Sequence, residues 1–219
     1  MRPGPARAAR LSVLARLQLG LEALYRVETR LAIDAFVIDE EARTAAGVTR
    51  APREQLLVRQ DDGELGLGLF VDAAAVANLE RHDPAAVGID DRNFTDFCLA
   101  VEGVSHFIYV ALRAADERGV SQLELELQAE VDKYACCLLV AGPTPDLRQR
   151  LYGDVRFAAD LDEEERARYQ AANSGASRYA DTLERRFVRP ERTSDLLSEL
   201  RRFYRMDLPD KLGHIARLH

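Results

Sequence analysis

Two helical segments dominate this sequence: Phe94–Arg113, FTDFCLAVEGVSHFIYVALR, and Leu123–Val140, LELELQAEVDKYACCLLV. Both are apolar almost all the way round a helix and carry only a few charged residues. Soluble proteins bury helices of this kind, and a buried charge needs a partner. We therefore expect the charged residues of the two segments to meet inside the fold.

A short connection separates these segments. The first is expected to run to about Glu117, before Gly119, and Ser121 is placed to cap the second, which stops at Gly142-Pro143. So short a connection between two helices favours an antiparallel pair. The sequence therefore predicts a central buried helical hairpin.

The polar residues of each segment fall at helical spacing. At about 100° per residue, one stripe of the first segment holds Thr95, Cys98, Glu102, His106, Tyr109 and Arg113. One stripe of the second holds Glu126, Glu130, Lys133 and Cys137, with Glu124 and Gln128 on its far side. If the stripes face each other, a Glu–His pair meets two carboxylates and a lysine. Gly103 lacks a side chain near the middle, so we expect a neighbouring helix to pack closely there.

A cluster of this composition could carry chemistry, because charges held in apolar surroundings shift the pKa values of acids and bases. Glu102 or Glu130 is the candidate general base, His106 the candidate acid, and Lys133 an electrostatic clamp. The same residues suggest a possible divalent metal, held by His106, Glu102 and Glu130. On this interpretation the protein is a metal-assisted or general acid–base hydrolase.

The same cluster also has a structural interpretation. The H-E-x-x-H motif of zinc peptidases and the paired E-x-x-H motifs of di-iron bundles are missing, since the chain holds E-x-x-x-H once. Glu102 and His106, four residues apart, can bond to each other, and Glu130 and Lys133 can form an ordinary ion pair. The cluster then fixes helix register, and the protein is a soluble bacterial accessory or protein-interaction protein with a protein partner. This is our leading interpretation.

A small β element is expected before the helical hairpin. Gln55–Gln60 and Glu64–Val71 flank Asp61-Asp62-Gly63, which is a strong turn signal. Alternate apolar residues of the second strand face the core, while Gly66 and Gly68 lie on its other side. Glycines at such positions are typical of a twisted edge strand or of a close approach to the backbone.

The remaining segments complete an α+β, mostly helical fold with C-terminal amphipathic helices. Further helices are predicted over Leu11–Arg26, Asp72–Arg81, Leu147–Phe157, Asp162 to about Phe187 and Ser194–Arg205. Val27–Ile38 fits either a strand or a helix, and Glu40–Pro52 reads as a polar connection. We expect a single domain over residues 1–219, with a β-containing part at about 20–72 and a helical part at about 73–206.

The composition excludes several classes of protein. With 219 residues, 47% of them hydrophobic, the chain can bury a core without disulfides or metals. Its three irregularly spaced cysteines argue against both a disulfide framework and a Cys-based zinc site, and favour a reducing compartment. Only Lys133 and Lys211 among the 30 basic residues are lysines, which suggests a GC-rich bacterial coding sequence. No phosphate-binding glycine loop or other cofactor motif is present.

The first 21 residues are basic but lack the apolar run of a signal peptide. We read them as a frayed leader that enters the first helix. No window approaches the ~18 uninterrupted apolar residues of a membrane span. The sequence therefore predicts a cytoplasmic protein without a membrane partner.

A net charge of −7 disfavours general binding to nucleic acid. One local exception is Arg185–Arg205, which holds seven arginines with Phe187, Phe203 and Tyr204 between them. RNA binding through these C-terminal helices is therefore a second alternative, after the hydrolase.

Overall fold

A computed structural model of the protein describes residues 11–48, 50, 52–61, 64–153, 155 and 160–218, with Glu64 described by its backbone alone. Three predicted features lie partly outside these residues. They are the leader up to residue 10, the turn residues Asp62 and Gly63, and the end of the helix predicted over Leu147–Phe157.

The helical hairpin forms the centre of the molecule, as predicted. Helix α5 spans Phe94–Ala115 and helix α6 spans Gln122–Ala141. The Ser121 side chain accepts a hydrogen bond from the Glu124 backbone N–H, which caps α6. The helix ends at Gly142, whose φ of 75° suits glycine. In the described part of the chain, α5 alone is long and apolar enough to cross a membrane, but it is mostly buried, as the core helix of a soluble protein is.

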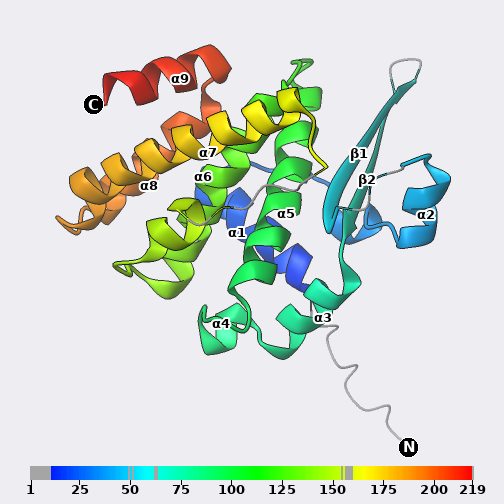
Figure 1. The fold of residues 1–219 in the computed structure, drawn as a ribbon, viewed down its shortest axis with the longest axis horizontal. Helices are drawn as coiled ribbons and strands as arrows, with labels where there is room; N and C mark the ends of the chain where they lie inside the picture. The colour runs from blue at the N-terminus through cyan, green and yellow to red at the C-terminus, as the bar shows by residue number, and fades with distance from the viewer. Residues whose placement is uncertain are drawn as a thin grey trace, which may run out of the picture.

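Other helices surround this hairpin (Figure 1). Their bounds are α1 Val13–Tyr25, α3 Ala73–Arg81, α7 Glu163–Leu183, α8 Thr193–Arg205 and α9 Leu208–Arg217. Helix α7 lies along α6, and both α1 and α3 pack on α5. Helix α8 packs against α1, so helices far apart in the sequence share one core. The predicted α+β, mostly helical fold is confirmed.

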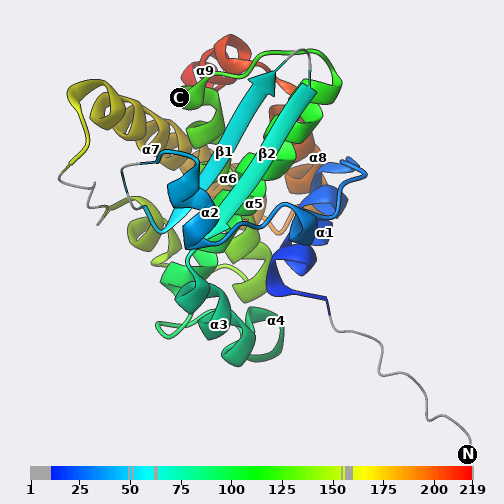
Figure 2. The same cartoon turned by 90° about the vertical axis from the view of Figure 1, so that its right-hand side faces the viewer.

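A two-stranded antiparallel sheet covers one side of α5 (Figure 2). Strand β1 spans Glu54–Asp61 and strand β2 spans Glu64–Val71. Glu54 lies opposite Val71, so the two share a face of the sheet. On the other face, a Cβ on Gly68 would lie 3.3 Å from Cδ1 of Ile38. The close approach signalled by this glycine is therefore made by a preceding segment of the same chain.

Residues 27–38 form neither the strand nor the helix that their sequence allowed. They form an extended connection with one 3₁₀ turn, Ile33–Ala35, and one parallel bridge from Val37 to Leu69. The Gln18 side chain of α1 donates to the Leu31 carbonyl and accepts from the Ile33 N–H. Side-chain bonds thus satisfy backbone groups that a helix or a strand ladder would otherwise pair.

The sequence also missed some short elements. Helix α2, Glu40–Ala45, lies in the expected polar connection, where Asp39 caps it. Helices α4, Pro84–Val87, and α9 were not predicted. The helix predicted over Leu147–Phe157 begins at Leu147 and continues as a π-helical turn, Gln149–Gly153, and its predicted end lies outside the described residues. A second π-helical turn, Glu184–Val188, continues α7.

Candidate functional site

The two predicted polar stripes face each other across the helical hairpin. Lys133 on α6 bridges two carboxylates, with its Nζ 3.1 Å from Oε2 of Glu102 on α5 and 2.7 Å from Oε1 of Glu130 on α6. These three predicted site residues are therefore brought together. Because Lys133 is only 12% exposed, the bridge lies largely out of water.

His106, the fourth predicted site residue, lies beside them but pairs differently. Its Nδ1 is 3.5 Å from Oε1 of Glu54, and its Nε2 is 3.8 Å from Oε2 of Glu126. The sequence suggested Glu102 as its partner, four residues away on the same helix. The structure instead places one carboxylate from β1 and one from α6 on opposite sides of the ring.

Glu54 is the residue of this cluster that the sequence did not reveal. It begins β1, on the face that carries Leu56 and packs on α5. A Cβ on Gly103 would lie 3.0 Å from Cγ of Glu54 and 3.1 Å from Cδ1 of Leu69. Gly103 therefore makes room for side chains of the β-hairpin, and our expectation of a close neighbouring helix there was wrong. The strand alternation that puts Glu54 on the inner face was the available signal.

We call these six residues the α5–α6 cluster: Glu54, Glu102, His106, Glu126, Glu130 and Lys133. Burial alone would lower the pKa of His106, but Glu54 and then Glu126 raise it to about 10. Burial raises the pKa of Glu126 to about 7, against the opposing effect of His106. Burial likewise raises the pKa of Glu54 and of Glu130. At neutral pH the imidazole is thus a cation, and the pKa of Glu126 lies much closer to neutrality than that of a carboxyl group in water.

Lys133 has the opposite effect on the carboxyl group of Glu102. Although burial opposes the effect, Lys133 lowers the pKa of Glu102. Glu102 and Glu130 in turn raise the pKa of Lys133 despite its burial. Lys133 and Glu102 therefore stay ionised at neutral pH. With a side chain 25% exposed, Glu102 is the part of the cluster most open to solvent.

Three buried atoms of the cluster have no hydrogen-bond partner: Oε1 of Glu54, Oε2 of Glu130 and Nε2 of His106. The contacts of His106 with Glu54 and with Glu126 are longer than ordinary hydrogen bonds. Lys133 contacts the other oxygen of Glu130, Oε1. Unpaired buried polar atoms are uncommon in proteins and point to a strained or functional position, or to bound water. The cluster is therefore neutralised in pairs but incompletely hydrogen-bonded.

The predicted metal ligands His106, Glu102 and Glu130 do not converge on one point. The two ring nitrogens of His106 face other carboxylates, and the Lys133 ammonium lies between Glu102 and Glu130. Across the described residues, no group of three or more His, Cys, Asp or Glu side chains is arranged as a metal site. The divalent metal stays a prediction for direct measurement.

A second buried network lies elsewhere on α6, and the sequence did not predict it. Asp132 accepts hydrogen bonds from Tyr25 of α1, from Ser105 Oγ at 2.6 Å and from Gln128 Nε2 at 2.7 Å. Lys211 of α9 is fully buried, and its Nζ donates to Tyr109 Oη and to Gln128 Oε1, both at 2.8 Å. This network ties α9 and α1 to the helical hairpin. Because α9 itself was not predicted, its lysine could not be placed.

The network shifts the pKa values of its own acid and base. Burial raises the pKa of Asp132 to about 6, against hydrogen bonds from Ser105 and Tyr25. Burial lowers the pKa of Lys211 to about 7, and the carboxylates of Glu124 and Asp132 only partly offset it. Both groups thus titrate much closer to neutrality than in water.

The three cysteines form no disulfide in the structure. Cys98, Cys136 and Cys137 are all free thiols. Burial raises the pKa of Cys136, and a hydrogen bond with Cys98, together with burial, raises that of Cys137. A thiol that stays protonated is a poor nucleophile.

The C-terminal arginines are largely engaged within the fold. Arg201 and Arg205 of α8 donate to the carbonyls of Leu24 and Tyr25 at the end of α1. Arg185, Arg192 and Arg202 form ion pairs with acidic residues three or four positions away in the sequence. These contacts give the arginines a structural role, and RNA binding by them remains an untested alternative.

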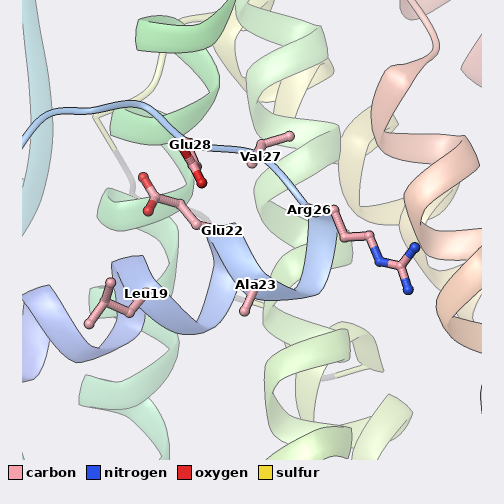
Figure 3. A pocket seen from close by; sticks show the side chains of 6 residues that line it. All are labelled: Leu19, Glu22, Ala23, Arg26, Val27 and Glu28. Atoms are coloured by element: carbon pink, nitrogen blue, oxygen red, sulfur yellow. The ribbon is translucent and has the colours of Figure 1, made fainter.

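A hollow of about 610 Å³ lies on the outer side of α1 (Figure 3). It is lined by Leu19, Glu22, Ala23, Arg26, Val27 and Glu28. None of the six residues of the α5–α6 cluster lines it. The hollow is therefore separate from the candidate site.

Comparison of the chain with protein-family models, with curated proteins and with solved structures gives no match.

Proposed function

We propose that the protein is a non-catalytic accessory protein that presents its β-hairpin to a protein partner. One observation carries the proposal: the charges of the α5–α6 cluster pair with each other across three elements. The imidazole of His106 on α5 lies between two carboxyl groups, those of Glu54 on β1 and Glu126 on α6. Beside them, Lys133 joins the two helices. Buried ionic groups arranged in this way can fix one packing of several elements.

The cluster anchors one end of the hairpin, and described apolar residues toward the other end are exposed. Glu54 is the first residue of β1, so the ion pair with His106 holds the base of the strand. Near the turn, Val58 is 51% exposed and Leu65 is 37% exposed. The hairpin leans away from α5 in that direction (Figure 1). Exposed apolar side chains on an anchored strand pair favour contact with another protein.

The proposal can be tested with a photo-crosslinking amino acid at Val58. The matched control is the same replacement at Val87 on α4, which is also 51% exposed. Irradiation in the source cells should yield a protein adduct from position 58 and none from position 87. Equal yields from both positions, or no adduct from either, would contradict the proposal.

A hydrolase remains the second candidate, because a specific observation favours it. His106 Nε2 and Glu130 Oε2 are buried without hydrogen-bond partners, and the pKa of Glu126, raised by burial, lies at about 7. A carboxyl group with such a pKa suits general acid–base catalysis at neutral pH.

Elemental mass spectrometry of the native protein and of the His106→Ala variant separates the two candidates. A stoichiometric divalent metal that is lost in the variant would replace the accessory-protein proposal by the metal-assisted hydrolase. A metal-free protein would remove the metal-assisted form of the hydrolase.

A further inference from the structure

The outer edge of β1 is a free strand edge. Strand β1 pairs with β2 along its whole length, from Glu54 opposite Val71 to Asp61 opposite Glu64. Among the residues that the structure describes, it makes no backbone hydrogen bond on its other side. The outer edge of β2, by contrast, is partly occupied, because Leu69 exchanges backbone hydrogen bonds with Phe36 and Ile38. Among the described residues, the backbone groups at the sheet edges that lack a backbone partner therefore lie mainly along β1.

This edge lacks most of the usual protections against pairing, and the one inward-pointing charge of the strand, Glu54, lies at its first residue. Natural proteins block strand edges with proline, bulges, short strands or inward-pointing charges. Strand β1 has eight residues, no proline and an unbroken register with β2.

The sequence of β1 is complementary to itself in one antiparallel register. A two-fold axis at Leu57 places residues of two copies opposite each other as follows: Leu57 with Leu57, Leu56 with Val58, Gln55 with Arg59, and Glu54 with Gln60. Apolar residues then face apolar ones, polar residues face polar ones, and no like charges are opposed.

The neighbouring two-fold registers fit less well. A shift by two residues in one direction places Glu54 opposite Val58. The opposite shift places Leu56 opposite Gln60. Each shift sets an apolar side chain against a polar one. The Leu57-centred register is therefore favoured over both.

The apolar face of the hairpin gives a second reason for pairing. Leu56 and Val58 share the face that packs on α5, but Val58 lies beyond the packed part and is 51% exposed. In the Leu57-centred register, Val58 of one copy lies beside Leu56 of the other, at the anchored base of that copy's hairpin. Pairing therefore covers an exposed apolar residue as well as an open edge.

We propose that two copies of this chain pair along β1, antiparallel and centred on Leu57, to form a continuous four-stranded sheet of order β2–β1–β1–β2. The inference rests on the proposed function, since it names a second copy as the partner of the same hairpin. The contact is isologous, because each copy offers the same edge.

The first test is sedimentation of the full-length chain over a wide range of concentrations. The wild-type protein should form a dimer. Leu57→Lys should raise the dimer dissociation constant by about tenfold or more, because it sets two ammonium groups opposite each other on adjacent strands. The control Leu65→Lys, on β2, should leave the dissociation constant unchanged. A monomeric wild type, or equal effects of both substitutions, would overturn the inference.

A second variant covers the case in which Leu57→Lys does not fold. Directly opposed residues have Cβ atoms about 4.5–5.5 Å apart, so Leu57→Cys should give a disulfide-linked dimer on mild oxidation after a small adjustment. In Leu65→Cys the new thiols lie on the two outer strands, at least about 14 Å apart. That variant and the wild type should stay unlinked. Linkage of both variants, or of neither, would count against β1 pairing.

The outcomes also separate this inference from the proposed function. A monomeric chain whose Val58 crosslinker captures a different protein overturns the dimer and leaves the proposed function in place. A chain whose Val58 crosslinker captures no protein, itself included, removes both.

Discussion

His106 and Lys211 are two buried cations whose pKa values move in opposite directions, and their neighbours explain the difference. Burial disfavours the charged form of both side chains. His106, however, lies between the carboxylates of Glu54 and Glu126, and its pKa rises to about 10. Lys211 bonds to two neutral oxygens, and burial lowers its pKa to about 7. Opposite pH dependences of stability follow from this contrast.

The charge of His106 should stabilise the fold at low pH. Its folded-state pKa lies above its value in the unfolded chain, so its contribution is fully present below about pH 6.5 and is lost as pH rises toward 10. At pH 6, His106→Gln should lower the free energy of unfolding by about 1–3 kcal/mol. Urea unfolding of both proteins at several pH values measures this. A difference that does not shrink with rising pH would show that the imidazole charge is not the cause.

Lys211 should behave in the reverse sense. Its folded-state pKa is lowered, so the wild-type protein gains stability as pH rises from about 7 toward 10.5. The variant Lys211→Met has no such titration, and its melting temperature should fall relative to the wild type over this range. Thermal unfolding of both proteins at matched pH values gives the comparison. A constant gap between the two melting temperatures would mean that Lys211 stays charged in the folded state.

At the scale of elements, Gly103 sets how closely the β-hairpin approaches α5. Alanine is normally the better helix former by about 1 kcal/mol, but a Cβ here would lie 3.0 Å from Glu54 and 3.1 Å from Leu69. We expect the steric cost to win, so that Gly103→Ala destabilises the protein by about 1–2 kcal/mol.

Gly20 in α1 provides the matched control for this substitution, because no atom lies within 4 Å of its Cβ position. Gly20→Ala should stabilise the protein by about 0.5–1 kcal/mol. Denaturant unfolding measures both variants. Equal gains in stability would show that the hairpin moves away freely and that Gly103 does not set its position.

The sequence predicts the long elements well, because each has a strong repeat and a clear boundary signal. Ser121 and Gly142 mark α6 in the sequence and in the structure, and the hairpin strands differ from prediction by one residue or less at most ends. The segment at residues 27–38 could not be predicted, since its backbone bonds to the Gln18 side chain rather than to a regular neighbour. Helix α2 is too short to show a periodic pattern.

The candidate site is predictable to the extent that it lies on one pair of helices. Helical spacing, together with the predicted antiparallel hairpin, brings Lys133 to Glu102 and Glu130. It does not bring Glu54, because the meeting of a strand residue with His106 depends on how the sheet lies on α5. The experiments proposed above distinguish a structural from a catalytic role of the α5–α6 cluster.

At the scale of the whole molecule, the early helix α1 and the late helix α8 are packed together. The rings of Tyr25 and Tyr204 stack with centroids 3.9 Å apart, and Arg201 and Arg205 donate to carbonyls at the end of α1. The predicted single domain should therefore unfold in one cooperative step.

Far-UV circular dichroism and tyrosine fluorescence, followed during urea unfolding, check this expectation. The two signals should give coincident curves, because helices and packed tyrosines are lost together. An earlier transition confined to about residues 20–72, detected by hydrogen exchange, would instead divide the chain into two folding units.

The contacts between α1 and α8 also bear on how the protein is made. The carbonyls of Leu24 and Tyr25 are bonded by side chains 177 and 180 residues further along the chain. At a synthesis rate of about 5–20 residues per second, the last turn of α1 waits roughly 10 to 35 seconds for these partners. The apolar α5 leaves the ribosome within that interval. The nascent chain should therefore carry exposed core surface of α5 during the second half of translation, where chaperones can bind it before release.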